Sequence, residues 1–448
     1  MVDQPTLLPL PDPVEPPAVP ATRPAQARLR RAVRNQDEWA PRKLDALLPP
    51  EHQARMIWAC LERLDLSSFY ASVKAVTDRP GRPASDPQVL LALWLYATAD
   101  AVGSARRLAR LCEEHDVYRW IRGGVPVDYH LLAEFRVTHQ KELDELLTQI
   151  LSVLLAKKLV KLDRVAQDGM KVRTSAGAAS FRAAEGLQEC LAEAREQVEA
   201  LKRERGNHEL KFSQRKAAAR ERAARERLER VEEALKLLPE AKAAKERQER
   251  TLAKPKRERV REARVSTTDA EARVMHMPDG GFRPAYNVEL ATDAESQIIV
   301  GLSISNRGSD QGEALPMETQ VHERTNVHPG AYLMDGGFVK LDDITALERA
   351  NVTVYAPLRP PRTTTSGREV TDPRPGDSPE VENWRTRMGT EKAKVIYKGR
   401  AATAECVNAR CRQRGIHQFS VRGLDKILSV MLFAVITHNL SRWTALTT

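Results

Sequence analysis

The sequence predicts an α/β protein in which an all-α domain precedes a mixed-sheet domain, and a helical coiled-coil hairpin is inserted into the latter. Three observations predict this arrangement. Residues 51–158 show helical periodicity, residues 183–263 are rich in Ala, Glu, Lys and Arg with heptad-like spacing, and the remaining segments alternate between strand and helix patterns. A chain of 448 residues is long enough to form two or three such domains.

The composition favours a nucleic-acid partner. Lys and Arg number 71 against 61 Asp and Glu, which gives a net charge of +10. Such a surplus suits a polyanion, either nucleic acid or an anionic membrane surface. The longest apolar run, Val89 to Ala97, falls far short of the roughly 20 residues that span a bilayer, so we expect no membrane partner.

The cysteines and the first residues indicate a cytoplasmic protein. The five cysteines are odd in number and show no zinc-like spacing, which is typical of free thiols in a reducing compartment. Pro and acidic residues stand where an export signal needs basic and then apolar residues. Residues 1–50 are rich in Pro, Ala and Arg, and we expect them to form a disordered basic arm.

Residues 51–158 are predicted to form a helical N-terminal DNA-binding domain. Leu90, Leu91, Trp94 and Leu95 have helical spacing. In the helix that follows, an apolar face is opposed by a basic one. The inward residues are Ala105, Leu108, Ala109 and Cys112, and the outward ones are Arg106, Arg107 and Arg110. This basic face either binds DNA, as in a helix-turn-helix, or is only solvated, and both interpretations stay open.

Residues 183–263 are predicted to form the inserted hairpin. Leu187, Leu191, Ala194, Val198 and Leu201 recur at steps of four and three, and residues 217–238 repeat the pattern. Gly206-Asn207 can reverse the chain, and Pro239 is expected to end the second arm. The alternative is a single solvated helix that mediates dimerisation.

The order of the strands predicts a ribonuclease-H-like domain made of residues 159–182 and 264–448. Candidate strands are 164–168, 285–291, 298–304, 331–334 and 352–356, with helices at 311–325 and 341–350 between the last ones. Three strands followed by alternating helices and strands are the order expected of this fold. The hairpin would then follow the first strand.

Three acidic residues are candidates for a catalytic site. Asp335 ends a buried strand and precedes Gly336-Gly337, which leave room for a phosphate or a metal ion. Asp168 ends the first strand, and Glu405 lies on a predicted helix whose same face carries Asn408 and Arg412. Three carboxylates from separate elements are what a two-metal phosphoryl-transfer site requires.

Several segments resemble, in order, the DDE transposases of bacterial insertion sequences, close to the eleven-eighty-two group. They are DGMKVRTSA, FRPAYNVELATD, AYLMDGGF, YKGRAATAECVNARCRQRG and HNLSRW, and the block PASDPQVLLALWLYATADAVGSARRLARL resembles the group's N-terminal domain. The resemblance implies that Asp168, Asp335 and Glu405 are the catalytic acids and hold two Mg²⁺ or Mn²⁺ ions. Asn287 and Asp269 resemble positions near such a site.

The resemblance also implies the DNA contacts. Tyr397 and Arg400 match a Tyr-x-x-Arg…Glu…Lys signature, and Arg412 stands where the family usually has Lys, which changes the contact geometry. These three residues are expected to position phosphates, with Lys171 and Arg173 as weaker candidates. For Tyr397, packing in the core is an equal alternative.

The implied activity is metal-dependent DNA cleavage and strand transfer at the terminal inverted repeats of a bacterial insertion sequence. The expected partners are the repeats, the target DNA and a second copy of the chain, in the nucleoid of the cytoplasm. Two other interpretations stay open: a non-catalytic DNA-binding scaffold, and a nuclease of the same fold that cuts without joining.

Overall fold

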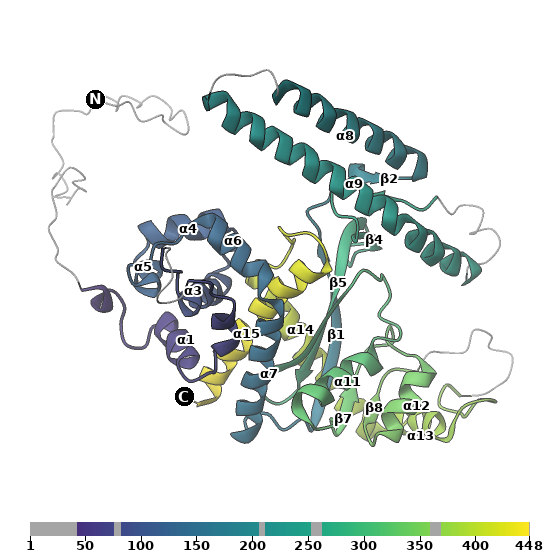
Figure 1. Ribbon diagram of the computed structural model, residues 1–448. Helices are drawn as coiled ribbons and strands as arrows, with labels where there is room; N and C mark the ends of the chain where they lie inside the picture. The colour runs from purple at the N-terminus through teal and green to yellow at the C-terminus, as the bar shows by residue number, and fades with distance from the viewer. Residues whose placement is uncertain (1–42, 76–81, 206–210, 252–261, 359–368, 448) are drawn as a thin grey trace, which may run out of the picture. The chain divides into compact units, whose positions relative to one another are not determined.

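The computed structural model describes residues 43–75, 82–205, 211–251, 262–358 and 369–447 (Figure 1). Most of the predicted disordered arm therefore lies outside the described residues. Its last part does not fit that prediction, because Leu44–Leu47 form a 3-10 helix, η1, and Leu48 is buried. Arg55 holds this turn by donating to Asp45 Oδ1 at 2.7 Å and to the carbonyl of Leu48 at 3.2 Å.

The helical domain agrees with the sequence pattern. Its helices are α1 (Gln53–Leu61), α2 (Ser67–Ala71), α3 (Pro87–Ala99), α4 (Ala105–Glu114), α5 (Asp116–Arg122), α6 (Tyr129–Thr138) and α7 (Gln140–Ala156). Helix α3 is apolar on every side, and most of its residues are buried. Helix α4 is amphipathic as predicted: Leu108 and Cys112 are buried, whereas Arg106, Arg107 and Arg110 are exposed.

The predicted mixed sheet is present. Its strands are β1 (Arg164–Arg173), β4 (Arg273–His276), β5 (Phe282–Asp293), β6 (Ile299–Ser305), β7 (Ala331–Leu333) and β8 (Thr353–Tyr355). The order is β6–β5–β1–β7–β8, and β4 also pairs with β5. Strand β5 pairs antiparallel with β1 and β6, while β7 pairs parallel with β1 and β8. This is the order of strands expected of a ribonuclease-H-like domain.

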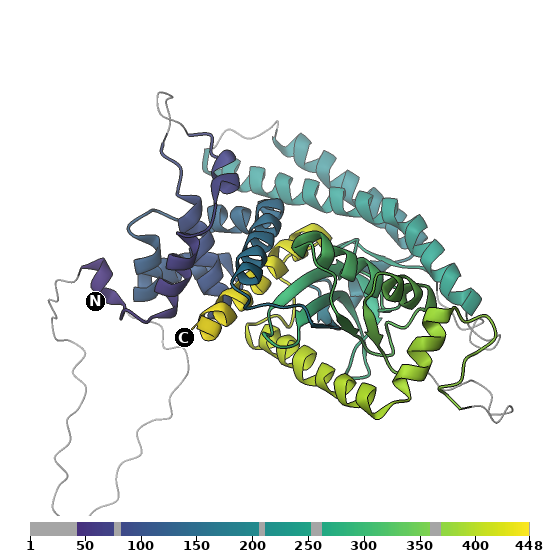
Figure 2. The same cartoon turned by 90° about the horizontal axis from the view of Figure 1, so that it is seen from below.

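The helices of this domain cover both faces of the sheet. They are α11 (Ala314–Thr325), α12 (Leu341–Arg349), α13 (Pro379–Met388), α14 (Glu391–Gln413) and α15 (Leu424–Thr447). Figure 2 shows α14 on one face and α11 and α12 on the other. Because side chains alternate along a strand, neighbouring residues of β1 meet different helices. Strand β1 continues to Arg173, five residues past the predicted strand end at Asp168.

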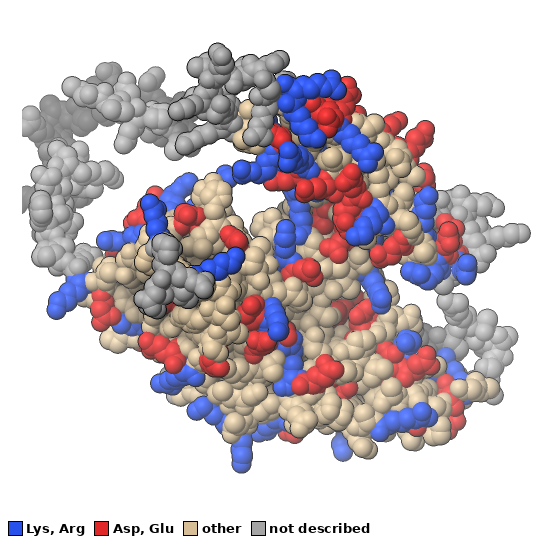
Figure 3. Space-filling view, viewed as in Figure 1, with Lys and Arg blue, Asp and Glu red and all other residues tan. Residues whose placement is uncertain are grey.

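The segment between β1 and β5 contains two long helices, α8 (Ala184–Arg205) and α9 (Lys211–Thr251), which lie side by side and run antiparallel (Figure 1). Val198 and Leu201 pack against Ala224, and Arg227 pairs with Glu193 at 2.9 Å. Figure 3 shows basic and acidic side chains interspersed on the hairpin, rather than a surface of one sign. The predicted reversal at Gly206-Asn207 lies outside the described residues.

One prediction about the hairpin is wrong, because Pro239 lies inside α9 and does not end it. A proline within a helix costs about 3 kcal/mol through a lost hydrogen bond and a clash. Here Leu238 and Ala241 pack against Leu187 and Val265, and this burial holds the helix on both sides of the proline. At its base, a turn of 3-10 helix, η2 (Ala178–Ser180), leads into a two-stranded sheet of β2 (Phe181–Arg182) and β3 (Val265–Ser266), which the sequence did not predict.

Helix α15 is the one helix in the described part of the chain that is long and apolar enough to cross a membrane. However, 67% of its most apolar window is buried, and the helix packs against α3, α7 and β6. It is therefore the core helix that joins the helical domain to the sheet.

His438 and Asn439 are buried in this helix and bond to the start of β6. The amide of Asn439 accepts from Ile299 N at 2.9 Å and donates to Ile299 O at 2.8 Å. The ring Nε2 of His438 lies 2.8 Å from the carbonyl of Gln297. These bonds give both side chains a structural role.

We expect His438→Gln to reduce the acid sensitivity of the fold. Burial, reinforced by nearby arginines, lowers the pKa of His438 from 6.5 to about 4. Below pH 6.5 the unfolded chain takes up a proton that the folded chain refuses, so stability is lost as pH falls from 6.5 to 4. At pH 5 this loss is about 2 kcal/mol. Urea unfolding of the variant between pH 7 and 5 should show a smaller loss than the wild type.

The exposed His417 provides the matched control. His417→Gln removes an imidazole that the fold does not bury, so its stability should fall with pH as the wild type's does. If the His438 variant also followed the wild-type curve, the buried imidazole would not be the source of the acid loss.

Candidate active site

The sheet brings Asp168 and Asp335 together. Strands β1 and β7 pair in parallel from Arg164 opposite Ala331 to Ala166 opposite Leu333. Two residues further along both chains, Asp168 stands opposite Asp335 on the same face. Burial raises the pKa of Asp168, Arg400 opposes this rise, and the negative charge of Asp335 adds to it. The two carboxylates are therefore close enough to repel each other.

Helix α14 covers this pair. Arg400 Nη1 lies 3.5 Å from Asp168 Oδ1, and Asn408 Nδ2 donates to Asp168 Oδ2 at 2.9 Å. The ring of Tyr397 is half-buried, and the Arg400 guanidinium lies 5.9 Å from it. The structure thus places the predicted Tyr397 and Arg400 at the pair, but Arg400 binds a carboxylate.

The third predicted acid does not join this pair. Glu405 is exposed, and so is Arg412 two turns further along α14. A step of three residues turns a helix by about 300°, so Glu405 and Asn408 point about 60° apart. Asn408 is buried against Asp168, whereas Glu405 lies at the exposed edge of that face. Within the described ranges, no three His, Cys, Asp or Glu side chains lie together as a metal site. The role of Glu405 therefore stays a prediction.

The other basic candidates lie elsewhere. Lys171 and Arg173 stand three and five positions after Asp168 on β1. Because successive side chains of a strand point to opposite faces, these two point to the other face of the sheet. Lys171 pairs in register with Asn287, whose side chain lies on that other face beside Gly169. The structure therefore does not bring Lys171 and Arg173 to the acid pair. Arg106, Arg107 and Arg110 belong to α4 in the helical domain.

A second group of acids, which the sequence did not single out, lies on the other face. Asn287 Nδ2 donates to Glu289 Oε1 and to Asp310 Oδ1, both at 2.6 Å. Asp310 also approaches Asp335, because a Cβ at Gly337 would lie 2.8 Å from Asp335 Oδ1 and 3.3 Å from Asp310 Oδ2.

Two glycines make room for these carboxylates. A Cβ at Gly169 would lie 2.9 Å from Glu289 Oε1, and Gly337 donates its backbone N–H to Asp335 Oδ1 at 2.6 Å. The predicted role of the Gly336-Gly337 pair thus falls on Gly337. Asp269, by contrast, is buried and accepts from Tyr286 Oη at 2.7 Å, which is a structural contact.

We expect Glu289→Gln to stabilise the fold at neutral pH. Burial, followed by the charge of Asp310, raises the pKa of Glu289 from 4.5 to about 9. The folded chain therefore keeps a proton that the unfolded chain releases above pH 4.5, and stability falls as pH rises from 4.5 to 9. Gln reproduces the neutral carboxyl and should add about 3 kcal/mol at pH 7. Urea unfolding in EDTA from pH 5 to 9 measures this.

Glu323→Gln on α11 is the control, because this substitution removes the same charge from an exposed position. Parallel pH curves for the Glu289 variant and the wild type would contradict the assignment of a buried, protonated carboxyl.

Two family models match the chain. One, described as a Transposase domain (DUF772), matches residues 42–138, and the other, described as a Transposase DDE domain, matches residues 257–440. The second match contains Asp335 and Glu405, whereas Asp168 lies before it, across the hairpin. No curated protein and no solved structure was found to match the chain.

Proposed function

The chain belongs to the DDE transposases of insertion sequences, and from this premise we propose that Asp168, Asp335 and Glu405 are its catalytic acids. The observation that carries the proposal is the register of β1 and β7, which sets Asp168 opposite Asp335 at the carboxyl end of β7. Enzymes of this family act on DNA and use divalent metal ions. The activity that follows is cleavage of DNA and its transfer to a new strand.

The residues of the pair fit a divalent cation. Two carboxylates on neighbouring strands repel each other, and their oxygens are the ligands that Mg²⁺ and Mn²⁺ prefer. We propose two such ions, which when bound would stabilise the attacking and the leaving oxygen of the phosphodiester. Arg400, which now pairs with Asp168, supplies the positive charge at this place.

Glu405 is proposed as the third ligand. In the described part of the chain its carboxylate has no hydrogen bond or ion pair, and it stands on the same helix as the two residues that hold Asp168. A rotation about its side-chain torsions costs little for an exposed, unpaired group. Its approach to the pair would complete the set of three acids.

The neighbouring side chains position the acids and the DNA. Asn408 donates a hydrogen bond to one oxygen of Asp168 and thereby fixes the orientation of this carboxylate. Arg400, once released from Asp168, and Arg412 on the exposed face of α14 would hold phosphates of the cleaved end. Tyr397 packs against Arg400 and limits where its guanidinium can move.

The other parts of the chain would serve DNA binding and assembly. We propose that residues 51–158 bind the terminal inverted repeats through the exposed arginines of α4, and that the hairpin of residues 183–263 is inserted into a catalytic domain made of residues 159–182 and 264–448. A homo-oligomer, at least a dimer, would hold both ends of the element. The protein would work on the bacterial nucleoid in the cytoplasm.

A strand-transfer assay tests this function against a nuclease. Purified protein is incubated with Mg²⁺, a labelled element end and a plasmid, and the products are separated by size. Joined product together with nicks is expected of the transposase. Nicks that never become joined product would favour a nuclease of the same fold, and binding without nicks would favour a scaffold.

A further inference from the structure

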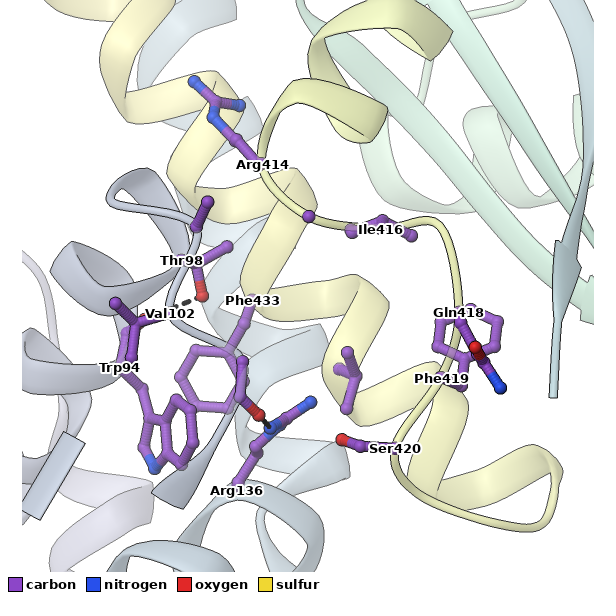
Figure 4. Close-up of a pocket in the computed structure, with 14 residues that line it drawn as sticks. Trp94, Thr98, Val102, Arg136, Arg414, Ile416, Gln418, Phe419, Ser420 and Phe433 are labelled. Carbon is purple, nitrogen blue, oxygen red and sulfur yellow. Dashed lines mark hydrogen bonds between the residues drawn. The ribbon is translucent and has the colours of Figure 1, made fainter. Parts of the chain in front are cut away.

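A cavity of about 70 Å³ lies where the helical domain meets the segment that links α14 to α15. Its walls come from α3, the loop before α4, α6, residues 414–420 and α15. In Figure 4, Trp94 and Phe433 stand on one side of Arg136, and Ser420 stands on the other. A single water molecule needs roughly 10 to 15 Å³ of such space, so the cavity has room for a small ion.

Arg136 is a buried cation in this cavity. Only 9% of the residue is exposed, and its guanidinium lies 4.7 Å from the Trp94 ring. One of its nitrogens, Nη1, donates to the carbonyl of Gly103 at 2.5 Å. Burial lowers the pKa of Arg136 to about 10, so the group is still charged at neutral pH.

The positive charge of Arg136 has no negative partner in the described part of the chain. Neither Asp nor Glu lines the cavity, and the hydrogen bond that Arg136 makes in the described part of the chain goes to the Gly103 carbonyl. A second arginine, Arg414, also lines the wall, although Figure 4 shows its guanidinium directed away from Arg136, toward the side of α15 where it donates to Ser441. A buried charge without a counter-charge is costly, and a bound anion would relieve that cost.

We propose that this cavity binds a phosphate group, held by the Arg136 guanidinium and the hydroxyl of Ser420. The planar fork of an arginine matches the oxygens of a phosphate, and the rings of Trp94 and Phe433 wall the site from one side. The cavity lies beside Gly103, directly before α4 and its exposed arginines. A phosphate of the backbone of bound DNA is therefore the source that we propose for this group. That source rests on the proposed function, whereas the anion site itself does not.

The test replaces Ser420 rather than Arg136, because Arg136 also supports Gly103 and Trp94 and its loss can unfold the domain. Ser420→Glu puts a carboxylate at the wall, where it would pair with Arg136 in place of the ligand. His417→Glu adds the same charge at an exposed position three residues away and is the matched control. All measurements use the full chain.

In the first arm, inorganic phosphate is added at constant ionic strength and the Tm is recorded. Phosphate should raise the Tm of the wild type and of His417→Glu by about 2 °C or more at saturation, and leave Ser420→Glu unchanged. Equal shifts for all three proteins, or none in the wild type, would overturn the proposal.

The second arm identifies the source of the phosphate. DNA affinity is measured against salt concentration, and the slope of log K on log salt should be smaller by about one for Ser420→Glu than for His417→Glu. Equal slopes, with the thermal result as expected, would assign the site to a free phosphate and overturn the DNA source alone. Failure of strand transfer would leave the thermal arm unaffected, so the two proposals fail separately.

Discussion

Asp335→Asn is expected to reduce DNA cleavage on the order of a thousand-fold or more and to leave DNA binding intact. The asparagine keeps the shape of the side chain and its bond from the Gly337 N–H, but it removes the charge that faces Asp168. A metal ion at such a site stabilises the transition state by several kcal/mol, and each 1.36 kcal/mol of this stabilisation changes the rate tenfold. Single-turnover cleavage of a labelled element end, with binding measured by gel shift, gives both quantities.

Asp342→Asn is the control for this experiment. It removes the same charge a few residues away, at an exposed position at the start of α12. It should cleave at the wild-type rate. Cleavage by Asp335→Asn at that same rate would remove Asp335 from the site. A parallel loss of DNA binding would instead show that the charge acts on the fold or on the DNA rather than on the chemistry.

The sheet could be predicted from the sequence because each strand carries its own local pattern. Residues 298–304 are rich in β-branched side chains and residues 331–334 form an apolar run, so each strand is predicted, whereas the order of the strands in the sheet comes from their pairing. The predicted strand at 164–168 is shorter than β1. The later residues of β1 include Lys171 and Arg173, and only their pairing with β5, such as Lys171 with Asn287, shows that they belong to the strand. Strand β4 is only four residues long, and β2 and β3 are two residues each and pair across the whole hairpin, so none of them leaves a local signal.

The same limit explains what was missed at the site. Asn408 looks like an ordinary helix residue until α14 is laid on β1 and its amide meets Asp168. Asp310 has no pattern of its own, and only the approach of Gly337 shows that it stands beside Asp335. Glu405 shows the reverse case: a family signature marks it, while its exposed position on α14 places it outside the contacts that hold the pair. Local pattern predicts elements, whereas the pairs between them depend on packing.

Glu405→Gln is the change that decides how the third acid acts. If Glu405 swings to the pair when the metal ions and DNA bind, the variant should lose cleavage by about a hundred- to a thousand-fold, because one ligand charge is missing. Its fold should be unchanged, since the side chain is exposed and makes no ion pair in the described structure. The measurement is the cleavage rate as a function of Mn²⁺ concentration, with Tm as the check on folding.

Glu391, on the same helix, provides the control for this experiment. Glu391→Gln removes an exposed carboxylate, paired with Lys394, from the first turn of the same helix and should leave the rate and its metal dependence unchanged. A lost ligand predicts that the Glu405 variant needs more Mn²⁺ for half-maximal rate, whereas a lost surface charge predicts no such shift. If Glu405→Gln cleaves as the wild type does, Glu405 is not a ligand of the metal ions. Asp310, which already lies beside Asp335, is then the carboxylate to replace next.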